Sequence, residues 1–484
     1  MKKAYSLAIS IVALSLSLLG CNNHNGGGNN SKENNRSNIV SLDIVAFNDF
    51  HGNTLDSDTG LGLAKTTTLI NELTKHSSNR LFISQGDMWQ GSAESNLTHG
   101  GLVTEWMNEQ GFASMTLGNH EFDWGQDDII ANNELANFPI LGINVYSTET
   151  NALVSYCKPS TIAKIGRAKI GIIGAIGDCY SSIASSQAKD IYFKVGDELT
   201  SLVKAEAKSL KEQGCDFIIY SVHDDDSAYN VELSDGYVDL VLEGHTHKNY
   251  IKKDSKGVYH VQGGGYNKSL PYISLNIDIA NDTYEVKDIK SIYTNDYSKL
   301  EDNEKTKELF DKYQDVIGDA RTPIGTNSAR RDSDFLRKLV SELYLEAGLE
   351  KWKDQYNIFL GGGYISCRSP YYLPSGDVSY ADVYNLFPFD NDIQLCSVSG
   401  YYLLKQFINT TNTNYFITYS EYGLGSVNNV DNNTTYYIIT DSYSSDYGPN
   451  NLTVIDTYSQ DCCYARDLLK DYIIKGGLDN KITL

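Results

Sequence analysis

The chain has 484 residues and a formal net charge of -22 at pH 7, from 62 acidic and 40 Lys or Arg side chains. This charge argues against binding to nucleic-acid polymers, because Lys and Arg contacts to phosphates supply most of that affinity. The charge does not exclude the binding of a small anionic substrate, since bound divalent cations can reverse the local electrostatic field. The 41% hydrophobic and 21% charged content is typical of globular protein, and the length predicts two domains plus a leader.

The first residues have the pattern of an export signal. Lys2 and Lys3 precede an apolar run, residues 7–19, that is too short and too early for a spanning helix. The run ends at Leu18-Leu19-Gly20-Cys21, which resembles a bacterial lipoprotein lipobox. The resemblance implies a signal peptide at 1–20, a lipid on Cys21 and a flexible tether at 21–38, rich in Asn, Gly and Ser. We therefore expect an exported protein anchored to a bacterial membrane, at the cell surface or the periplasmic face; a plain secretory signal is the alternative.

Short apolar runs then alternate with helical periodicity, which predicts an α/β domain with a buried sheet over residues 39–297. The expected strands are 41–47, 81–84, 114–117, 140–145, 170–175, 217–222, 240–243 and 259–262. Helix spacing is found at 63–75 and 198–213. A charged stretch, 299–313, predicts an exposed linking helix within a connection at 298–320. A second domain, 321–484, opens with helix spacing at 335–349.

Chemistry-bearing residues follow the apolar runs of the first domain. The sequences at these places are Asn48-Asp49-Phe50-His51-Gly52, Gly86-Asp87, Gly118-Asn119-His120-Glu121-Phe122-Asp123, Ser221-Val222-His223 and Gly244-His245-Thr246-His247. The carboxyl ends of strands are where open α/β sheets place their ligand-binding loops. Each motif alone is weak, but their number and order predict one site.

The residue types suit a pair of metal ions. Two cations at roughly 3.5–4 Å repel one another unless a carboxylate bridges them. Strand alternation is expected to point Asp49 and His51 the same way, and the same i, i+2 spacing relates His245 and His247. Imidazole and carboxylate ligands fit Zn, Mn, Fe or Co. The eight cysteines form no CxxC pair, so a thiolate zinc site is not expected, and their pairing cannot be read from the sequence.

These motifs resemble the calcineurin-like metallophosphoesterases, and the longer forms around Asp49 and Asn119 resemble the 5'-nucleotidase family. The resemblance implies a four-layer αββα metallophosphoesterase domain and a smaller α+β C-terminal substrate-binding domain. It assigns one metal to Asp49, His51, Asp87 and His247, and the other to Asp87, Asn119, His223 and His245. His120, oriented by Asp123, is implied as the catalytic dyad.

The implied reaction is hydrolysis of nucleotide phosphoesters, in which two divalent cations lower the pKa of a bound water. The implied substrate contacts lie in the second domain. Arg368 follows a Gly-rich loop at 361–363 later than the family's arginine does, whereas Phe389 and Asn391 match the family's base-binding motif closely. Tyr443 and Asp446 stand where the family has a longer Gly-rich stretch, and an ordinary loop is the alternative there.

Three readings of function remain open. The leading one is a 5'-nucleotidase that releases nucleoside and inorganic phosphate. A 2',3'-cyclic-nucleotide phosphodiesterase/3'-nucleotidase or a UDP-sugar hydrolase would use the same scaffold. A non-catalytic surface binding protein is the third, although it would crowd like charges in one cleft without need. The preferred nucleotide, the native metal and the oligomeric state are left open by the sequence.

Overall fold

The computed structural model describes residues 38–57, 60–184, 187–225, 230, 232–234, 236–368, 370–447, 451–458 and 464–480. The expected signal peptide, tether and lipidated Cys21 lie outside these residues. No helix in the described ranges is long and apolar enough to cross a membrane.

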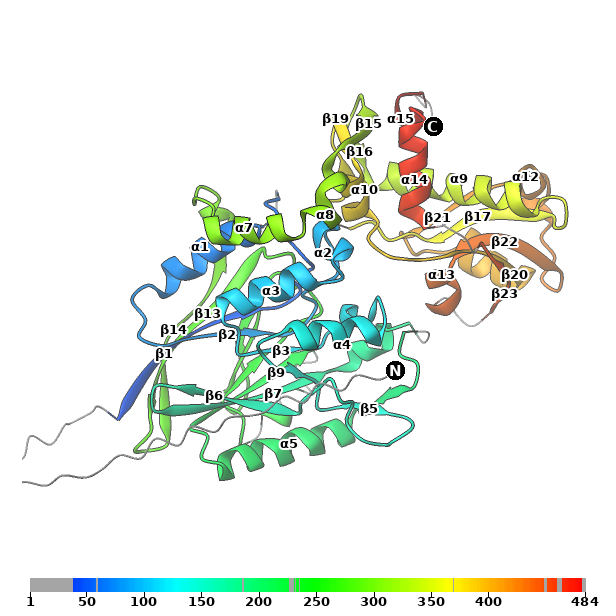
Figure 1. The fold of residues 1–484 in the computed structure, drawn as a ribbon. Helices are drawn as coiled ribbons and strands as arrows, with labels where there is room; N and C mark the ends of the chain where they lie inside the picture. Colours follow the sequence, from blue (N-terminus) through cyan, green and yellow to red (C-terminus); the bar gives the residue numbers. More distant parts are fainter. Residues whose placement is uncertain are drawn as a thin grey trace, which may run out of the picture. The chain divides into compact units, whose positions relative to one another are not determined.

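Two six-stranded sheets form the first domain (Figure 1). The first sheet has the order β14-β13-β1-β2-β3-β4, with strands Thr283–Tyr293, Ser269–Asp278, Ile39–Phe47, Arg80–Ser84, Ser114–Thr116 and Ile140–Leu141. The second has the order β11-β12-β10-β9-β7-β6, with strands Tyr250–Lys253, Tyr259–Gln262, Leu240–Leu242, Phe217–His223, Ala168–Ile176 and Ser160–Ile165. Neighbours β1 to β4 run parallel, as do β7, β9, β10 and β12.

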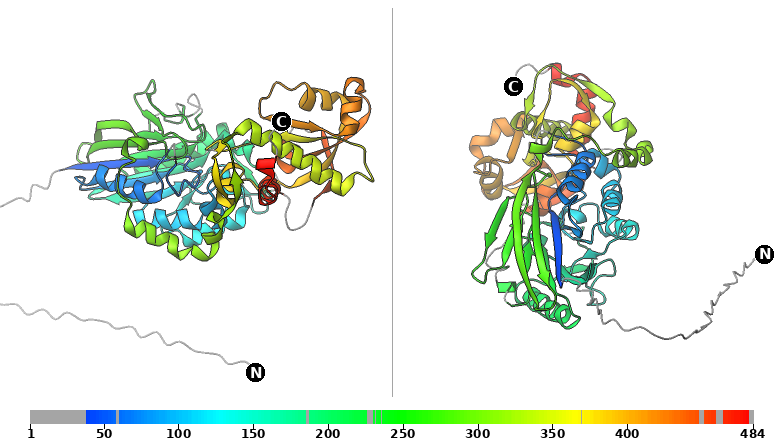
Figure 2. Two further views of the ribbon diagram at one scale, coloured as in Figure 1. Left: turned by 90° about the horizontal axis from the view of Figure 1, so that it is seen from above. Right: turned by 90° about the vertical axis from the view of Figure 1, so that its left-hand side faces the viewer.

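The sheets pack face to face and helices cover their outer faces, which confirms the four layers expected (Figure 2). Alternation along β1 sends Leu42 and Ile44 into the core between the sheets and Val45 towards the helices. The outer helices are α1 (Leu63–Thr74), α3 (Gly101–Gln110) and α4 (Gln126–Leu135) on one side and α5 (Asp197–Glu212) on the other. Shorter elements are α2 (Ala93–Leu97), β5 (Val145–Ser147), β8 (Ile191–Phe193) and the 3₁₀ turns η1 (His120–Phe122), η2 (Asp178–Ser182) and η3 (Thr294–Tyr297).

Helix α7 (Glu304–Lys312) corresponds to the expected linking helix but starts later, because the Asn303 side chain caps it by accepting from the Thr306 N–H. It is not simply exposed: Leu309 is buried in the core beneath α1 and α3. Helix α8 (Gln314–Ile317) and the turn η4 (Gly318–Arg321) follow. Most side chains of α7 are exposed, as expected for the linking helix, and Thr306 and Leu309 form its packed face.

The C-terminal part is a second α/β domain built on a five-stranded sheet of order β21-β17-β22-β20-β23. Its strands are Tyr415–Tyr419, Ile358–Tyr364, Thr435–Asp441, Ile393–Ser399 and Leu452–Thr457. The long helix α9 (Ser333–Trp352), α10 (Tyr380–Leu386) and α14 (Ala465–Ile474) contribute to its larger core. The smaller elements are β15 (Pro323–Asn327), β16 (Arg331–Asp332), β18 (Tyr372–Leu373), β19 (Gly376–Ser379), α11 (Gly400–Tyr402), a π-helical turn η5 (Leu403–Ile408), α12 (Glu421–Ser426), η6 (Val427–Asn429), α13 (Ser442–Tyr447) and α15 (Gly477–Asn480).

Candidate active site

The strands of both sheets deliver the predicted ligands to one place. Asp49 and His51 follow β1, Asp87 follows β2 and Asn119 follows β3, all in the first sheet. The other ligands come from the second sheet, where His223 is the last residue of β9 and His245 and His247 follow β10.

One group consists of Asp49, His51 and His247, whose ligand atoms all lie within 4.8 Å of one another. His51 Nε2 is 3.1 Å from His247 Nε2, and His247 Nε2 is 3.3 Å from Asp49 Oδ1. His51 Nδ1 lies 2.9 Å from the Gln90 carbonyl oxygen, a contact that fixes the proton on Nδ1 and leaves Nε2 with its lone pair. The donor set therefore suits a cation among these three side chains.

A second group lies on the other side of Asp87. Asp87 Oδ2 is 3.1 Å from His223 Nε2 and 3.9 Å from His51 Nε2, so this carboxylate stands between the two groups. His245 Nδ1 is 3.1 Å from Asn119 Oδ1. The structure thus brings together all seven residues expected to ligate metal, with Asp87 in the bridging position.

The expectation that strand alternation aligns the i, i+2 pairs is wrong, because none of these pairs lies on a strand. Asp49, His51, Asp87, His245 and His247 all have positive φ, between 48° and 75°. Side chains rarely adopt this left-handed conformation, and where it persists the surroundings must hold it. Here the Tyr266 N–H donates to the Asp49 carbonyl (2.7 Å) and the His51 N–H to the Asp87 carbonyl (2.9 Å).

Burial and charge set the protonation of the group. Burial raises the pKa of Asp49, but the hydrogen bond from His247 and the charge of His223 bring it down to about 2. Burial lowers the pKa of His223, yet the neighbouring Asp87 outweighs that effect and raises it to about 10. Burial and His247 hold the pKa of His51 well below its usual range. In the metal-free protein, the protonated imidazole of His223 therefore offsets part of the negative charge of the buried carboxylates.

The dyad residues are in contact. His120 Nδ1 lies 2.8 Å from Asp123 Oδ2 across the 3₁₀ turn η1. Burial lowers the pKa of His120, but Asp123 and Asp87 outweigh it and the net direction is upward. The backbone N–H of His120 also donates to Asp87 Oδ1 (2.9 Å), which links the dyad to the carboxylate that lies between the two groups.

Two predicted substrate residues of the second domain lie beside this dyad. Arg368 Nη2 is 3.1 Å from His120 Nε2, and its guanidinium lies 4.8 Å from the centre of the Phe389 ring. The Phe389 and His120 ring centres are 5.6 Å apart. The side chains of Arg368 and Phe389 thus meet at the edge of the group of expected metal ligands, which we call the metal group.

Comparison with known proteins agrees with this arrangement. The model of the family described as calcineurin-like phosphoesterase matches residues 42–249. A 5'-nucleotidase of Diplobatis ommata is 27% identical over 414 residues, covering 75% of this chain and 70% of that protein. The 5'-nucleotidase precursor from Thermus thermophilus shares the fold, with a TM-score of 0.69 at 18% identity over 90% of this chain and 97% of that one.

Residues 42–249 of this chain thus match the calcineurin-like phosphoesterases, and the chain is similar to 5'-nucleotidases. Some relatives are much longer than this chain. The trifunctional nucleotide phosphoesterase protein YfkN of Bacillus subtilis is 24% identical over 75% of this chain, which spans only 29% of that protein.

The other expected substrate residues lie further along the second domain. Asn391 is half-buried just after Phe389. Tyr443 packs against Tyr364 with ring centres 5.3 Å apart, and Asp446 is exposed on the same short helix, α13. Their roles stay predictions.

Sequence reasoning missed the role of Glu121. Its buried carboxylate accepts the backbone N–H groups of Asp87, Met88 and Gly118 at 2.7–2.8 Å. Burial and Asp87 raise its pKa to about 7. Glu121 therefore joins the turns after β2 and β3, and its place in the motif next to His120 was the available signal.

Tyr266 was missed as well. Its ring stacks on His51 with centres 4.9 Å apart and meets His247 edge-on at 5.3 Å. Its hydroxyl accepts from Arg368 Nη1 at 3.3 Å. Tyr266, Arg368 and His51 also line a cavity of about 250 Å³ beside the metal group. Nothing in the sequence pattern marks a tyrosine for this position.

Proposed function

We propose that this metallophosphoesterase is a 5'-nucleotidase that hydrolyses a nucleoside monophosphate to nucleoside and inorganic phosphate. The observation that carries the proposal is the meeting of Arg368 and Phe389 with His120 at the metal group. A phosphate among the metal ligands would lie within reach of the Arg368 guanidinium, and a base could stack on the nearby aromatic ring.

Two divalent cations held by the seven ligands would supply Lewis acidity and an activated water. The protein's own groups do the rest. Arg368 and His120 would donate hydrogen bonds to the phosphoryl oxygens, whose charge is more strongly stabilised where such donors are fixed in advance. Asp123 holds the His120 ring through Nδ1, leaving Nε2 directed at the substrate. In the overall reaction water adds its oxygen to phosphorus, the P–O bond to the nucleoside breaks, and the leaving oxygen takes a proton.

Phe389 would provide the base platform and Asn391 a hydrogen bond to the base, with Tyr443 and Asp446 as further contacts. Stacking on an aromatic side chain contributes about 1–3 kcal/mol and tolerates different bases. The platform therefore favours nucleotides over simple phosphate esters without fixing the base.

The test uses protein stripped by chelation and reloaded with single metals. Hydrolysis of AMP, UDP-glucose, 2',3'-cyclic AMP and ribose 5-phosphate is measured by chromatography of the organic products together with the released phosphate. We expect AMP to be preferred, and Phe389→Ala to raise KM for AMP roughly tenfold while that for ribose 5-phosphate changes less than twofold. Tyr422→Ala, at an exposed site on α12, is the control.

Each other outcome has a meaning. Equal effects of Phe389→Ala on both substrates would remove the stacking role. Preference for the cyclic or sugar nucleotide would favour the cyclic phosphodiesterase or the UDP-sugar hydrolase. A metal-loaded protein that hydrolyses none of the four substrates would support the non-catalytic binding protein.

A further inference from the structure

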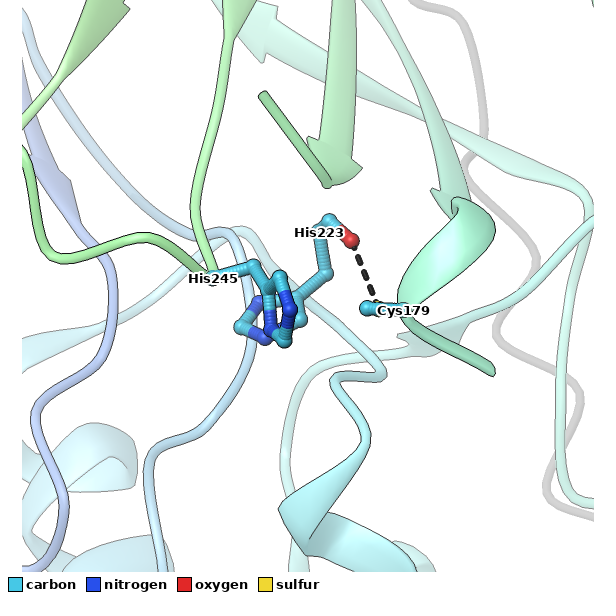
Figure 3. Close-up of side chains that lie close together, drawn as sticks. All are labelled: Cys179, His223 and His245. Carbon is cyan, nitrogen blue, oxygen red and sulfur yellow. Dashed lines mark hydrogen bonds between the residues drawn. The ribbon is translucent and has the colours of Figure 1, made fainter. Parts of the chain in front are cut away.

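A buried cysteine lies against the metal group, where no thiol was expected. Figure 3 shows Cys179 close to His223 and His245, with its sulfur hydrogen-bonded to the His223 backbone. The Cys179 Sγ atom and one ring nitrogen from each histidine all lie within 4.8 Å of one another.

Strand pairing puts the thiol there. β7 and β9 run parallel with Ile176 paired to His223, so the turn after β7 must fold across the end of β9. The Gly177 N–H donates to the His223 carbonyl (3.4 Å) and the Asp178 N–H to Asp224 Oδ2 (3.0 Å). A Cβ on Gly177 would stand 2.2 Å from that same Asp224 oxygen, so the turn packs tightly here. The position of Cys179 is therefore fixed by the backbone.

The histidine atoms near the thiol are those of a ligand site. The His223 ring is fully buried, and in the described ranges Nε2 makes no hydrogen bond of normal geometry, although Asp87 Oδ2 is 3.1 Å away. The opposite nitrogen, Nδ1, lies 2.6 Å from the Gln85 carbonyl oxygen, so Nε2 is the atom available to a metal.

We propose that the Cys179 sulfur is an additional ligand of the ion held by His223 and His245. One metal position then has sulfur, nitrogen and oxygen ligands, whereas the position at Asp49, His51 and His247 has only nitrogen and oxygen. As the bond to sulfur forms, the thiol proton leaves to solvent. Metal–sulfur and metal–nitrogen bonds of about 2.3 and 2.0 Å need these atoms roughly 3.5 Å apart, so the ion draws them together by no more than about 1.3 Å.

The consequence is a difference in metal preference between the two positions. Thiolate favours zinc, cobalt and cadmium over manganese and magnesium, which prefer oxygen ligands. The proposal uses the same metal centre as the proposed function but needs no turnover to be tested.

The experiment is spectroscopic titration of the metal-free protein with Co²⁺. A thiolate bound to Co²⁺ gives an intense near-ultraviolet charge-transfer band, absent with nitrogen and oxygen ligands alone. We expect the band to saturate at one Co²⁺ per chain, to be lost in Cys179→Ser and to stay in Cys215→Ser. Cys215 is the matched control, because it is also buried and lies before the opposite end of β9.

Competition with Cd²⁺ adds a second readout. Cys179→Ser should weaken Cd²⁺ binding at least tenfold while Mn²⁺ binding changes less than twofold. The unsubstituted protein decides the question even if the variant does not fold, since two bound Co²⁺ ions without the band would overturn the proposal. So would a band that persists in Cys179→Ser. A band with no phosphatase activity would leave the sulfur ligand standing and count against the proposed function alone.

Discussion

His223 and Asp87 form a buried ion pair when no metal is present, and a metal must take the place of the proton. With a pKa raised to about 10, the ring of His223 is protonated at neutral pH. A metal ligand must be the neutral imidazole, so loading requires that proton to leave. Metal affinity and pH are thereby linked at a single nitrogen, Nε2.

We predict that metal loading at pH 7 releases about one proton from His223, and a second if Cys179 also binds. The apparent affinity should rise about tenfold per pH unit for each proton released, below pH 10, because the folded-state pKa of His223 lies above its usual 6.5. Calorimetry in buffers of different ionisation enthalpy counts the protons. Proton release near zero would show that His223 is already neutral.

The sequence singled out the seven expected ligands, which the structure places together, because the chemistry demands particular residue types. Asp49, Asp87 and His245 could be selected by type and by their place after an apolar run. Glu121 stood in the motif next to His120, but its role could not be read there, since a carboxylate that accepts backbone N–H groups looks like any other acid in a sequence. Cys179 carried no motif at all, and only the pairing of β7 with β9 brings it to the site.

At the level of elements, the segments that follow the strands present every expected ligand except His223, which is the last residue of β9. The glycine-rich turn at 263–265 shows how closely they are built, since a Cβ on Gly265 would lie 2.6 Å from the His247 ring. That turn leads to Tyr266, whose backbone N–H holds Asp49. The shape of this turn therefore affects Asp49 and His247, both of which belong to the group that could hold one metal.

We predict that Gly265→Ala displaces the His247 ring and weakens one of the two metal positions. Metal analysis after dialysis should fall from about two ions per chain towards one, while the unfolding transition changes little. The control is Gly425→Ala, where an added Cβ meets nothing within 4 Å. Retention of both ions in the Gly265 variant would contradict the assignment of His247 as a ligand.

The elements themselves were predicted where hydrophobic patterning was strong. The expected strand at 140–145 is instead two short strands, β4 and β5, separated by Gly142, Ile143 and Asn144. The hairpin of β13 and β14 was missed for two physical reasons. Pro271 lies within the first strand, and a proline in a sequence argues against a strand. Most side chains of the second strand are exposed, so it lacks a hydrophobic face.

Over the whole molecule, one arginine of the last long helix supports the proposed base platform. Arg466 is only 4% exposed, and its Nη1 donates to the carbonyls of Phe389 (3.0 Å) and Pro388 (3.4 Å). Its Nη2 pairs with Asp390, and its guanidinium lies 4.1 Å from the Tyr384 ring centre. The Pro388 carbonyl also accepts from Asn96 of the first domain (3.1 Å).

We predict that Arg466→Met loosens this turn and raises KM for AMP about fivefold to tenfold while kcat and metal content change less than twofold. A buried, charged hydrogen-bonding group is removed, which costs about 1.5–3 kcal/mol of stability. Arg466→Lys should restore part of the KM, and Lys475→Met, exposed at the end of the same helix, should change nothing. A parallel fall of kcat for AMP and ribose 5-phosphate would mean a general structural effect instead.

Such long-range support was beyond prediction from the sequence. Phe389 and Arg466 are far apart in the sequence, and the two meet only because α14 packs beside α10, which ends just before Phe389. The second domain itself could be foreseen as a helix followed by a Tyr-rich unit. Its strand order, with β17 beside β22, depends on packing that no local pattern reports.

The metal ligands come from both sheets of the first domain, and this has a mechanical consequence. Asp49, Asp87 and Asn119 follow strands of one sheet, whereas His223 ends a strand of the other sheet and His245 follows one. Cations bound by ligands from both sheets would crosslink the two sheets and oppose sliding of one sheet across the other. Amide hydrogens of β1, β2, β9 and β10 should accordingly exchange more slowly once the ions are loaded.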